Sequence, residues 1–324
     1  MTDHLLTSSR YTVDRIADQV YSRVGGKNRL ADIYLPQAKG RRFPVVLWLH
    51  GGGWRFGDRK LAPDLSRFLA ERGFAMVSID YRLSDEAIFP APVIDVKTAV
   101  RWVRSVAGEY SFDPEDIGLW GSSAGGHLAA CAALSGENQF MNEEHNGFSS
   151  AVNAVLDSCG PTDFSMIDAD RRKPSAIQSD AESILVKDVL PANDPNSFES
   201  RLIGTAVGSS PSQVQAANPI TYVHAAAPPF LIMHGQSDPL IPWQQSWLFF
   251  EALGQHKIDA TLILLERLGH GFFNNPKLDA VDPGKITIHR SPASMQSPGS
   301  LSLNSVRFGF DMVEAFFRTH LNPG

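Results

Sequence analysis

The chain has 324 residues, of which 43% are apolar, 20% charged and 10% aromatic, and these ordinary globular proportions exclude disordered, collagen-like and coiled-coil proteins. Lysine and arginine total 29 against 35 acidic residues, for a net charge of −6, so the positive surface that nucleic acids or anionic membranes attract is not expected. We predict one domain over residues 1–324, because a chain of this length can bury a large core without disulfides or structural metal.

Short runs of β-forming residues alternate with helical periods, which predicts an α/β fold with a mostly parallel sheet and helices on both faces. About eight strands are expected, at residues 16–24, 29–35, 45–50, 75–80, 117–121, 152–158, 230–234 and 260–266. Apolar residues recur at helical spacing in residues 61–72, 93–107, 123–134, 243–253 and 305–319. Only a short turn separates the first two strands, which favours an antiparallel hairpin.

Two segments interrupt this alternation. Residues 164–217 are polar and contain several prolines, with a short helix expected near 181–189, and residues 275–304 are rich in proline and serine. Connections of this length are uncommon in compact domains and often form lids or binding loops. We therefore predict two insertions that shape the entrance to a site, with disordered loops as the alternative.

The cysteine content and the first residues of the chain indicate the cellular compartment in which the protein is expected. Cys131 and Cys159 are the only cysteines, too few for a disulfide framework. The first ten residues lack the basic start and apolar run of a secretory signal, and the longest apolar stretches are far shorter than the roughly 20 residues that span a bilayer. We expect a cytoplasmic protein without a membrane span, and a processed secreted form stays open.

Residues 121–125 read Gly-Ser-Ser-Ala-Gly and match the pattern G-x-S-x-G. The pattern alone is weak evidence, but an expected strand precedes it and an expected helix follows, as at the nucleophile elbow of hydrolases. There Gly121 and Gly125 would let the strand and the helix approach, while a strained turn exposes the Ser123 hydroxyl as a nucleophile. A tight turn with a buried serine is the alternative.

Three consecutive glycines, Gly51 to Gly53, follow the expected strand that ends at His50. Glycines leave backbone N–H groups open to an anion, and an HGGG-type loop supplies oxyanion donors in lipases and esterases, beside the N–H after the nucleophile, here that of Ala124. A phosphate-binding loop would need a following Lys-Ser/Thr or G-x-G-x-x-G spacing, which are absent. Residues 80–82, Asp-Tyr-Arg, are expected to brace this loop through a buried Asp or Arg contact.

A nucleophilic serine needs a base and an orienting carboxylate, which follow it in the order Ser, Asp/Glu, His in such proteins. Asp238 lies after the expected strand 230–234, and His270 lies after the expected strand 260–266. Asp157, near the end of another strand, is the rival acid, and His234 is expected to brace a loop. No His/Cys/Asp cluster has metal-ligand spacing, so neither a metal nor a cofactor is expected.

Aromatic residues adjoin each of these motifs. Trp54 follows the glycine loop, Trp243 follows the segment that contains Asp238, and Phe272 follows His270. They are candidates for lining an acyl or aromatic pocket, and ordinary core packing is the alternative.

Six ordered motifs together resemble the α/β-hydrolase esterases, and are most similar to the bacterial feruloyl and acetyl xylan esterase-like group beside the hormone-sensitive-lipase-like esterases. These motifs are His50 to Trp54, Asp80 to Leu83, Phe89 to Val96, Gly121 to Leu128, His234 to Pro239 and Gly269 to Phe272. The resemblance implies the α/β-hydrolase fold and a serine carboxylesterase without cofactor that acts on small to medium esters, including acetyl or aromatic ones. It implies as site residues the nucleophile Ser123, the base His270, its partner Asp238, and the oxyanion donors Gly52, Gly53 and Ala124.

The sequence departs from the family pattern in the two insertions and at residues 84–86, Ser-Asp-Glu, where such esterases often carry a proline. Substrate choice therefore stays open. An amide or formamide hydrolase of the kynurenine formamidase type would use the same residues, whereas a non-catalytic ligand-binding protein on this fold would typically lack one of the three. The expected partner is a small-molecule ester, with no nucleic acid, and a homodimer is left open.

Overall fold

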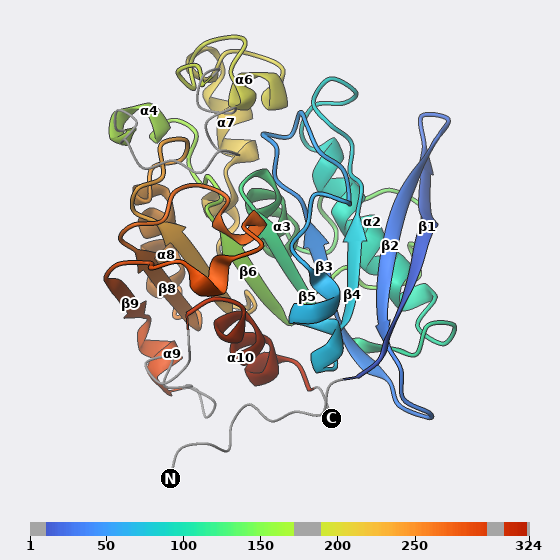
Figure 1. Cartoon of the computed structure of the whole chain (residues 1–324). Helices are drawn as coiled ribbons and strands as arrows, with labels where there is room; N and C mark the ends of the chain where they lie inside the picture. The colour runs from blue at the N-terminus through green and yellow to red at the C-terminus, as the bar shows by residue number, and fades with distance from the viewer. Residues whose placement is uncertain (1–10, 172–188, 297–307, 323–324) are drawn as a thin grey trace.

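The computed structural model describes residues 11–171, 189–296 and 308–322. Within these residues one nine-stranded sheet has the order β1-β2-β4-β3-β5-β6-β7-β8-β9 (Figure 1). Its strands are β1 (Val13–Val24), β2 (Lys27–Pro36), β3 (Phe43–Leu49), β4 (Ala75–Ile79), β5 (Phe112–Ser122), β6 (Ala154–Ser158), β7 (Phe230–Gly235), β8 (Ala260–Leu265) and β9 (Ile286–Arg290). The strands from β4 to β8 run parallel, and β1, β2 and β9 are joined to the sheet by antiparallel pairings.

The predicted mostly parallel sheet and the β1–β2 hairpin are confirmed. One strand was not predicted, because β9 lies inside the segment 275–304 that was expected to be an insertion. The five residues of β9 are only partly buried. The proline and serine residues around them are typical of loops, so the sequence did not indicate a strand there. Pairing with β8 makes this stretch part of the sheet, which corrects the interpretation of the whole segment as a lid.

Helices cover both faces of the sheet, as predicted. They are α1 (Leu65–Phe68), α2 (Ala91–Ser105), α3 (Ala124–Leu134), α4 (Ile167–Asp170), α6 (Phe198–Ile203), α7 (Pro211–Ala217), α8 (Gln244–Gln255), α9 (Pro292–Gln296) and α10 (Phe310–His320). The helix expected over 61–72 is shorter, because Pro63 precedes the cap Asp64, whose side chain accepts the N–H of Arg67. The short helix expected near 181–189 lies outside the described residues except for Val189.

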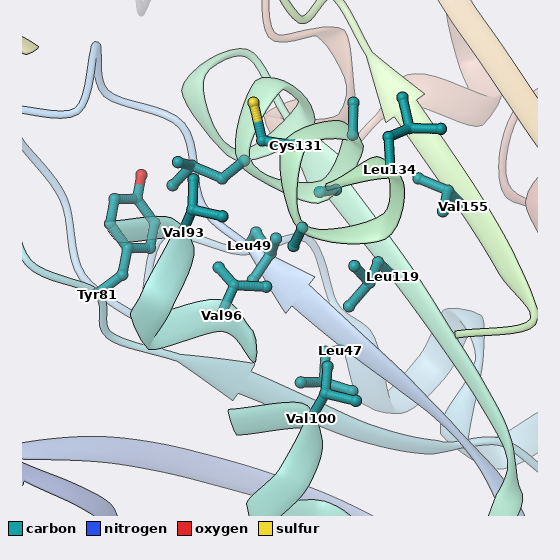
Figure 2. Close-up of a cluster of buried hydrophobic side chains, with 14 of the residues drawn as sticks. Leu47, Leu49, Tyr81, Val93, Val96, Val100, Leu119, Cys131, Leu134 and Val155 are labelled. Carbon is teal, nitrogen blue, oxygen red and sulfur yellow. The ribbon is translucent and has the colours of Figure 1, made fainter. Parts of the chain in front are cut away.

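The core has two layers because successive strand residues point to opposite faces. Along β3, Leu47 and Leu49 belong to a cluster with α2, α3 and α8, while Val46 and Trp48 belong to a second cluster with α1 and α10. Figure 2 shows the first layer, where Leu47 and Leu49 face the apolar side of α2. All seven residues of β3 are buried, as expected for a central parallel strand. No helix in the described part of the chain has the length and apolarity to cross a membrane.

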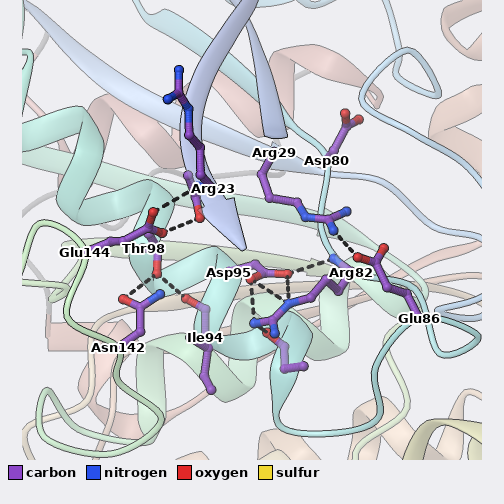
Figure 3. A network of polar contacts seen from close by, with 12 residues as sticks. Arg23, Arg29, Asp80, Arg82, Glu86, Ile94, Asp95, Thr98, Asn142 and Glu144 are labelled. Atoms are coloured by element: carbon purple, nitrogen blue, oxygen red, sulfur yellow. Dashed lines mark hydrogen bonds and ion pairs between the residues drawn. The ribbon is translucent and has the colours of Figure 1, made fainter. Parts of the chain in front are cut away.

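Polar side chains of the segment after β4 form contacts around the loop that follows β3. Tyr81 donates a 2.8 Å hydrogen bond to the carbonyl of His50, and the two rings stack 4.2 Å apart. Arg82 forms several hydrogen bonds with the buried Asp95 of α2, the shortest 2.7 Å long (Figure 3). Of these residues Tyr81 contacts the loop directly, whereas Arg82 holds the chain after β4 against α2.

A buried guanidinium fixes the far end of the same loop. Arg59 is 6% exposed and bonds to Asp32 at 2.8 Å and to Asp80 at 2.9 Å, while its backbone N–H also donates to Asp80. Burial opposes the charge on Asp32, but hydrogen bonds from Asp18, Arg15 and Arg59 lower its pKa overall. This cluster ties β2, β4 and the loop together.

We predict that Arg59→Met lowers the free energy of unfolding by about 3 kcal/mol, because it removes the cation that pairs with the buried Asp32 and the partly buried Asp80. Urea denaturation measures this loss. Arg267→Met is the control, since its ion pair with Asp282 is exposed and should contribute less than about 1 kcal/mol. Equal losses in the two variants would contradict a special role for the Arg59 cluster.

Candidate active site

Ser123 lies in a sharp turn between β5 and α3, with φ 56° and ψ −120°. A Cβ on Gly121 would lie 2.1 Å from the Gly125 carbonyl oxygen, and a Cβ on Gly125 would lie 2.0 Å from that of Leu49. Only glycine permits either approach, because real side chains do not come so close. Both glycines of the G-x-S-x-G pattern therefore hold the backbone geometry that was predicted for a nucleophile elbow.

The three residues expected to act together lie in one hydrogen-bonded row. His270 Nε2 is 2.7 Å from Ser123 Oγ, and His270 Nδ1 is 2.6 Å from Asp238 Oδ2. The side chain of Asp238 is fully buried and that of His270 nearly so. Because a carboxylate only accepts hydrogen bonds, it keeps the ring proton on Nδ1 and leaves Nε2 facing the serine hydroxyl.

The Asp238 carboxylate is surrounded by donors. Its Oδ1 accepts the backbone N–H groups of Leu240 at 2.8 Å and Ile241 at 2.9 Å, and His234 Nε2 lies 3.1 Å from its Oδ2. Burial works against ionisation, but the charge of His270 and hydrogen bonds from His234 and His270 hold the pKa of Asp238 well below its usual range. The group is therefore expected to be a carboxylate at neutral pH.

Asp157, the rival acid, has other contacts. Its Oδ1 accepts the N–H of Gly160 at 3.0 Å and lies so close to Gly126 of α3 that a Cβ there would be 2.1 Å away. Burial raises the pKa of Asp157 to about 6. Of the two candidates, the structure brings Asp238 to His270.

The glycine loop lies directly beside the elbow. A Cβ on Gly51 would be 3.1 Å from the carbonyl oxygen of Ser122, and Gly52 has φ 115°, with Phe56 so near that no side chain could be added. Among the hydrogen bonds of the described residues, none uses the N–H of Gly52 or Gly53. Ala124 opens α3, where backbone N–H groups have no partner within the helix. Gly52 and Gly53 thus line the same cavity as Ser123, Ala124 follows Ser123 directly in the chain, and the three predicted donors have backbone N–H groups available.

A cavity of about 790 Å³ opens over Ser123 and His270, a size typical of small-molecule sites. Trp54 and Phe272 line it as predicted, whereas Trp243 is not among its lining residues and packs against the core at the start of α8. Both lining aromatics are also packing residues, since Trp54 donates to His127 at 3.2 Å and the Phe272 ring lies 4.7 Å from that of Phe273.

Several residues of this cavity were not predicted from the sequence. Phe198 and Glu199 of α6, with Arg171 after α4, enter it from the segment 164–217. Arg171 Nη2 lies 3.9 Å from Glu199, its Nη1 donates to the Leu190 carbonyl at 2.8 Å, and burial raises the pKa of Glu199. No periodic pattern in that segment could have indicated which of its polar residues turn inward.

One group of three metal-ligand side chains occurs in the described residues, formed by Cys159, Asp238 and His270 with ligand atoms within 4.8 Å of one another. Asp238 and His270 already bond to each other at 2.6 Å. Burial raises the pKa of the Cys159 thiol well above its usual value, so the thiolate that binds metals is disfavoured. The contact between Asp238 and His270 is therefore better explained by a hydrogen bond than by joint binding of a metal ion.

Comparison with known proteins finds esterases among the relatives of this chain. Esterase LipQ of Mycobacterium tuberculosis is 35% identical over 71% of this chain and 50% of its own length, and the probable carboxylic ester hydrolase LipM of the same organism is 33% identical over 65% of this chain and 45% of its own. The chain spans about half the length of these curated relatives.

Solved structures of esterases share the fold. A truncated carbohydrate esterase from gut microbiota is 28% identical with a TM-score of 0.66, covering 85% of this chain and 95% of that one. Esterase 2 of Thermogutta terrifontis, phosphonylated by sarin, is 28% identical with a TM-score of 0.63, covering 81% and 86%. The expected α/β-hydrolase fold is thus confirmed. The family model described as BD-FAE matches residues 31–253, and the chain belongs to the BD-FAE family.

Proposed function

We propose that this chain is a serine carboxylesterase in which Ser123 is the nucleophile, His270 the base and Asp238 its orienting partner. The observation that carries the proposal is His270, whose two ring nitrogens lie 2.7 Å from Ser123 Oγ and 2.6 Å from Asp238 Oδ2. The esterases among its relatives and structural neighbours support the same reaction class.

The mechanism follows from these contacts. His270 Nε2 takes the hydroxyl proton as Ser123 Oγ attacks the ester carbonyl, and backbone N–H groups of Gly52, Gly53 and Ala124 stabilise the oxyanion of the tetrahedral intermediate. His270 then gives the proton to the leaving alcohol. Water, activated by the same base, attacks the acyl-enzyme and releases the acid.

The cavity suggests small to medium esters, including those with acetyl or aromatic groups. Its volume of about 790 Å³ exceeds what an acetyl group needs, and its wall carries apolar side chains such as Phe198, Leu240 and Phe272. A neutral apolar moiety is favoured there, because a charged group would lose its hydration. Amide or formamide hydrolysis is the competing outcome of the substrate test below.

We also propose a cytoplasmic location. Cys131 and Cys159 are both buried and free of disulfides, which is compatible with a reducing compartment. Fractionation of the source cells with an antibody to this chain would test the location.

We predict that Ser123→Ala loses on the order of 10⁴–10⁶ in kcat for esters while keeping its circular dichroism spectrum, because no other group can form the acyl-enzyme. The panel pairs p-nitrophenyl acetate, butyrate and benzoate with the matching anilides. An organophosphonate probe should label the wild type and not the variant. Ester hydrolysis by Ser123→Ala above a few per cent would refute the assigned nucleophile, and faster anilide than ester turnover would favour the amidase.

For the acid we predict that Asp238→Asn lowers kcat by about 10⁴, because an amide can hold the wrong imidazole tautomer. Asp157→Asn should have a much smaller effect, since asparagine keeps an acceptor for the Gly160 N–H. Steady-state kinetics of both purified variants give the comparison. A larger loss of kcat in Asp157→Asn than in Asp238→Asn would instead assign the orienting role to Asp157.

We propose that the chain is one catalytic domain and that parts of 164–217 and 275–304 form the entrance to its cavity. Leu190 comes from the first segment and Val281 from the second, and both line the cavity. Leu190→Trp and Val281→Trp should lower kcat/KM for benzoate relative to acetate esters by about tenfold, because a narrower opening excludes the larger group. Met295→Trp is the control, since Met295 is exposed and does not line the cavity. An unchanged ratio in the first two variants would contradict the entrance role.

A further inference from the structure

A second histidine bonds to the carboxylate that faces His270. His234, at the end of β7, is fully buried, and its Nε2 lies 3.1 Å from Asp238 Oδ2 and 3.0 Å from the Ile241 carbonyl oxygen. Its Nδ1 lies 2.7 Å from Ser246 Oγ, in the first turn of α8. Each ring nitrogen of His234 therefore has a partner.

The chemistry of these partners determines where the ring proton lies. Nε2 faces a carboxylate oxygen and a carbonyl oxygen, which are both acceptors, so it must carry a hydrogen. The Ser246 hydroxyl can then donate to Nδ1 of the neutral ring. In this arrangement His234 needs no charge to donate to Asp238.

The two histidines meet at one oxygen atom. Oδ2 of Asp238 accepts from His270 Nδ1 and His234 Nε2, while Oδ1 accepts two backbone N–H groups. A carboxylate can rotate about its Cβ–Cγ bond, and rotation would turn Oδ2 away from His270. The backbone groups restrain one oxygen and His234 restrains the other.

We propose that His234 is a positioning residue. Together with Ser246 it holds Oδ2 of Asp238 toward His270, so that the His270 ring stays oriented with Nε2 toward Ser123 Oγ. The inference rests on the proposed esterase function for its consequence in catalysis. It goes beyond that function by extending the hydrogen-bonded row from Ser123, His270 and Asp238 into β7 and α8.

Other titratable groups face this part of the site. Asp157 of β6 interacts electrostatically with His234, and Cys159 lies within 4.8 Å of Asp238 and His270. The variants below leave both groups in place, and Asp157 loses its interaction with the imidazole equally in His234→Leu and His234→Gln, so a difference between the pH profiles of these two variants reports on the contact with Asp238.

The test compares His234→Leu with His234→Gln. Leucine removes the donor, whereas the glutamine amide can place an N–H near the position of Nε2. We expect His234→Leu to lower kcat about 10- to 100-fold, the effect of one hydrogen bond to a charged group, with little change in KM and a shifted acid limb of the kcat/KM profile. His234→Gln should recover most of the kcat. Wild-type kcat in His234→Leu, or equal losses in the two variants with an unshifted profile, would overturn the proposal.

A second readout does not depend on turnover. The Nδ1 proton shared by His270 and Asp238 should give a far-downfield proton NMR signal in the wild type and in His234→Gln, and a broadened or absent one in His234→Leu. If wild-type protein hydrolysed no substrate and took up no phosphonate probe, the proposed function would fail. The NMR comparison would then still decide whether His234 orders the Asp238–His270 contact.

If His234→Leu does not fold, Ser246→Ala is used as the test variant in its place. It removes the partner of Nδ1, so a loss of kcat and a broadened signal are expected, and an unchanged enzyme would overturn the proposal. Ser294→Ala is the matched control, because it removes a buried hydroxyl that bonds to Thr261 at 3.1 Å, on elements that take no part in this row.

Discussion

The site depends on a backbone approach that leaves no room for side chains. At the end of β5, Gly121 touches the backbone of Gly125 in α3, and Gly125 in turn touches the last residue of β3. The turn between β5 and α3 therefore meets the end of β3, which is distant in sequence, at one point. The backbone of Gly51 also lies against Ser122, so close backbone contact places the loop after β3 beside Ser123.

Buried charge imposes the second constraint. An unpaired carboxylate in the interior costs several kcal/mol, and this cost is offset only when donors from different elements converge on it. Asp238 collects donors from His234, His270 and the backbone of its own loop. At the loop after β3, Arg59 does the same for Asp32 and Asp80. Each cluster restricts the relative positions of the strands and loops that it joins.

The hydrogen-bonded row of the site and the wall of its cavity come from different regions of the chain. The row from Ser123 to Asp238 stands on the carboxyl ends of parallel strands, where α/β sheets bind ligands. The cavity wall above it includes Phe198 from α6 and Val281 from the stretch before β9. Phe198 lies so close to Gly53 that its ring would meet a Cβ there at 2.7 Å. The segment that contains α6 thus packs against the glycine loop after β3 as well as forming part of the cavity wall.

The sequence by itself determined the strand-turn-helix at Ser123, the glycine loop at Gly51 to Gly53, and the strand-end positions of Asp238 and His270. These follow from local rules, because glycine patterns and apolar strands have the same meaning wherever they occur. Only the tertiary structure decided between Asp238 and Asp157, since both follow strands of one sheet and differ in which neighbour each side chain faces. It also decided that β9 joins the sheet, that Trp243 packs against the core and that Glu199 enters the cavity. Such outcomes depend on contacts between residues far apart in the chain, and no local pattern contains them.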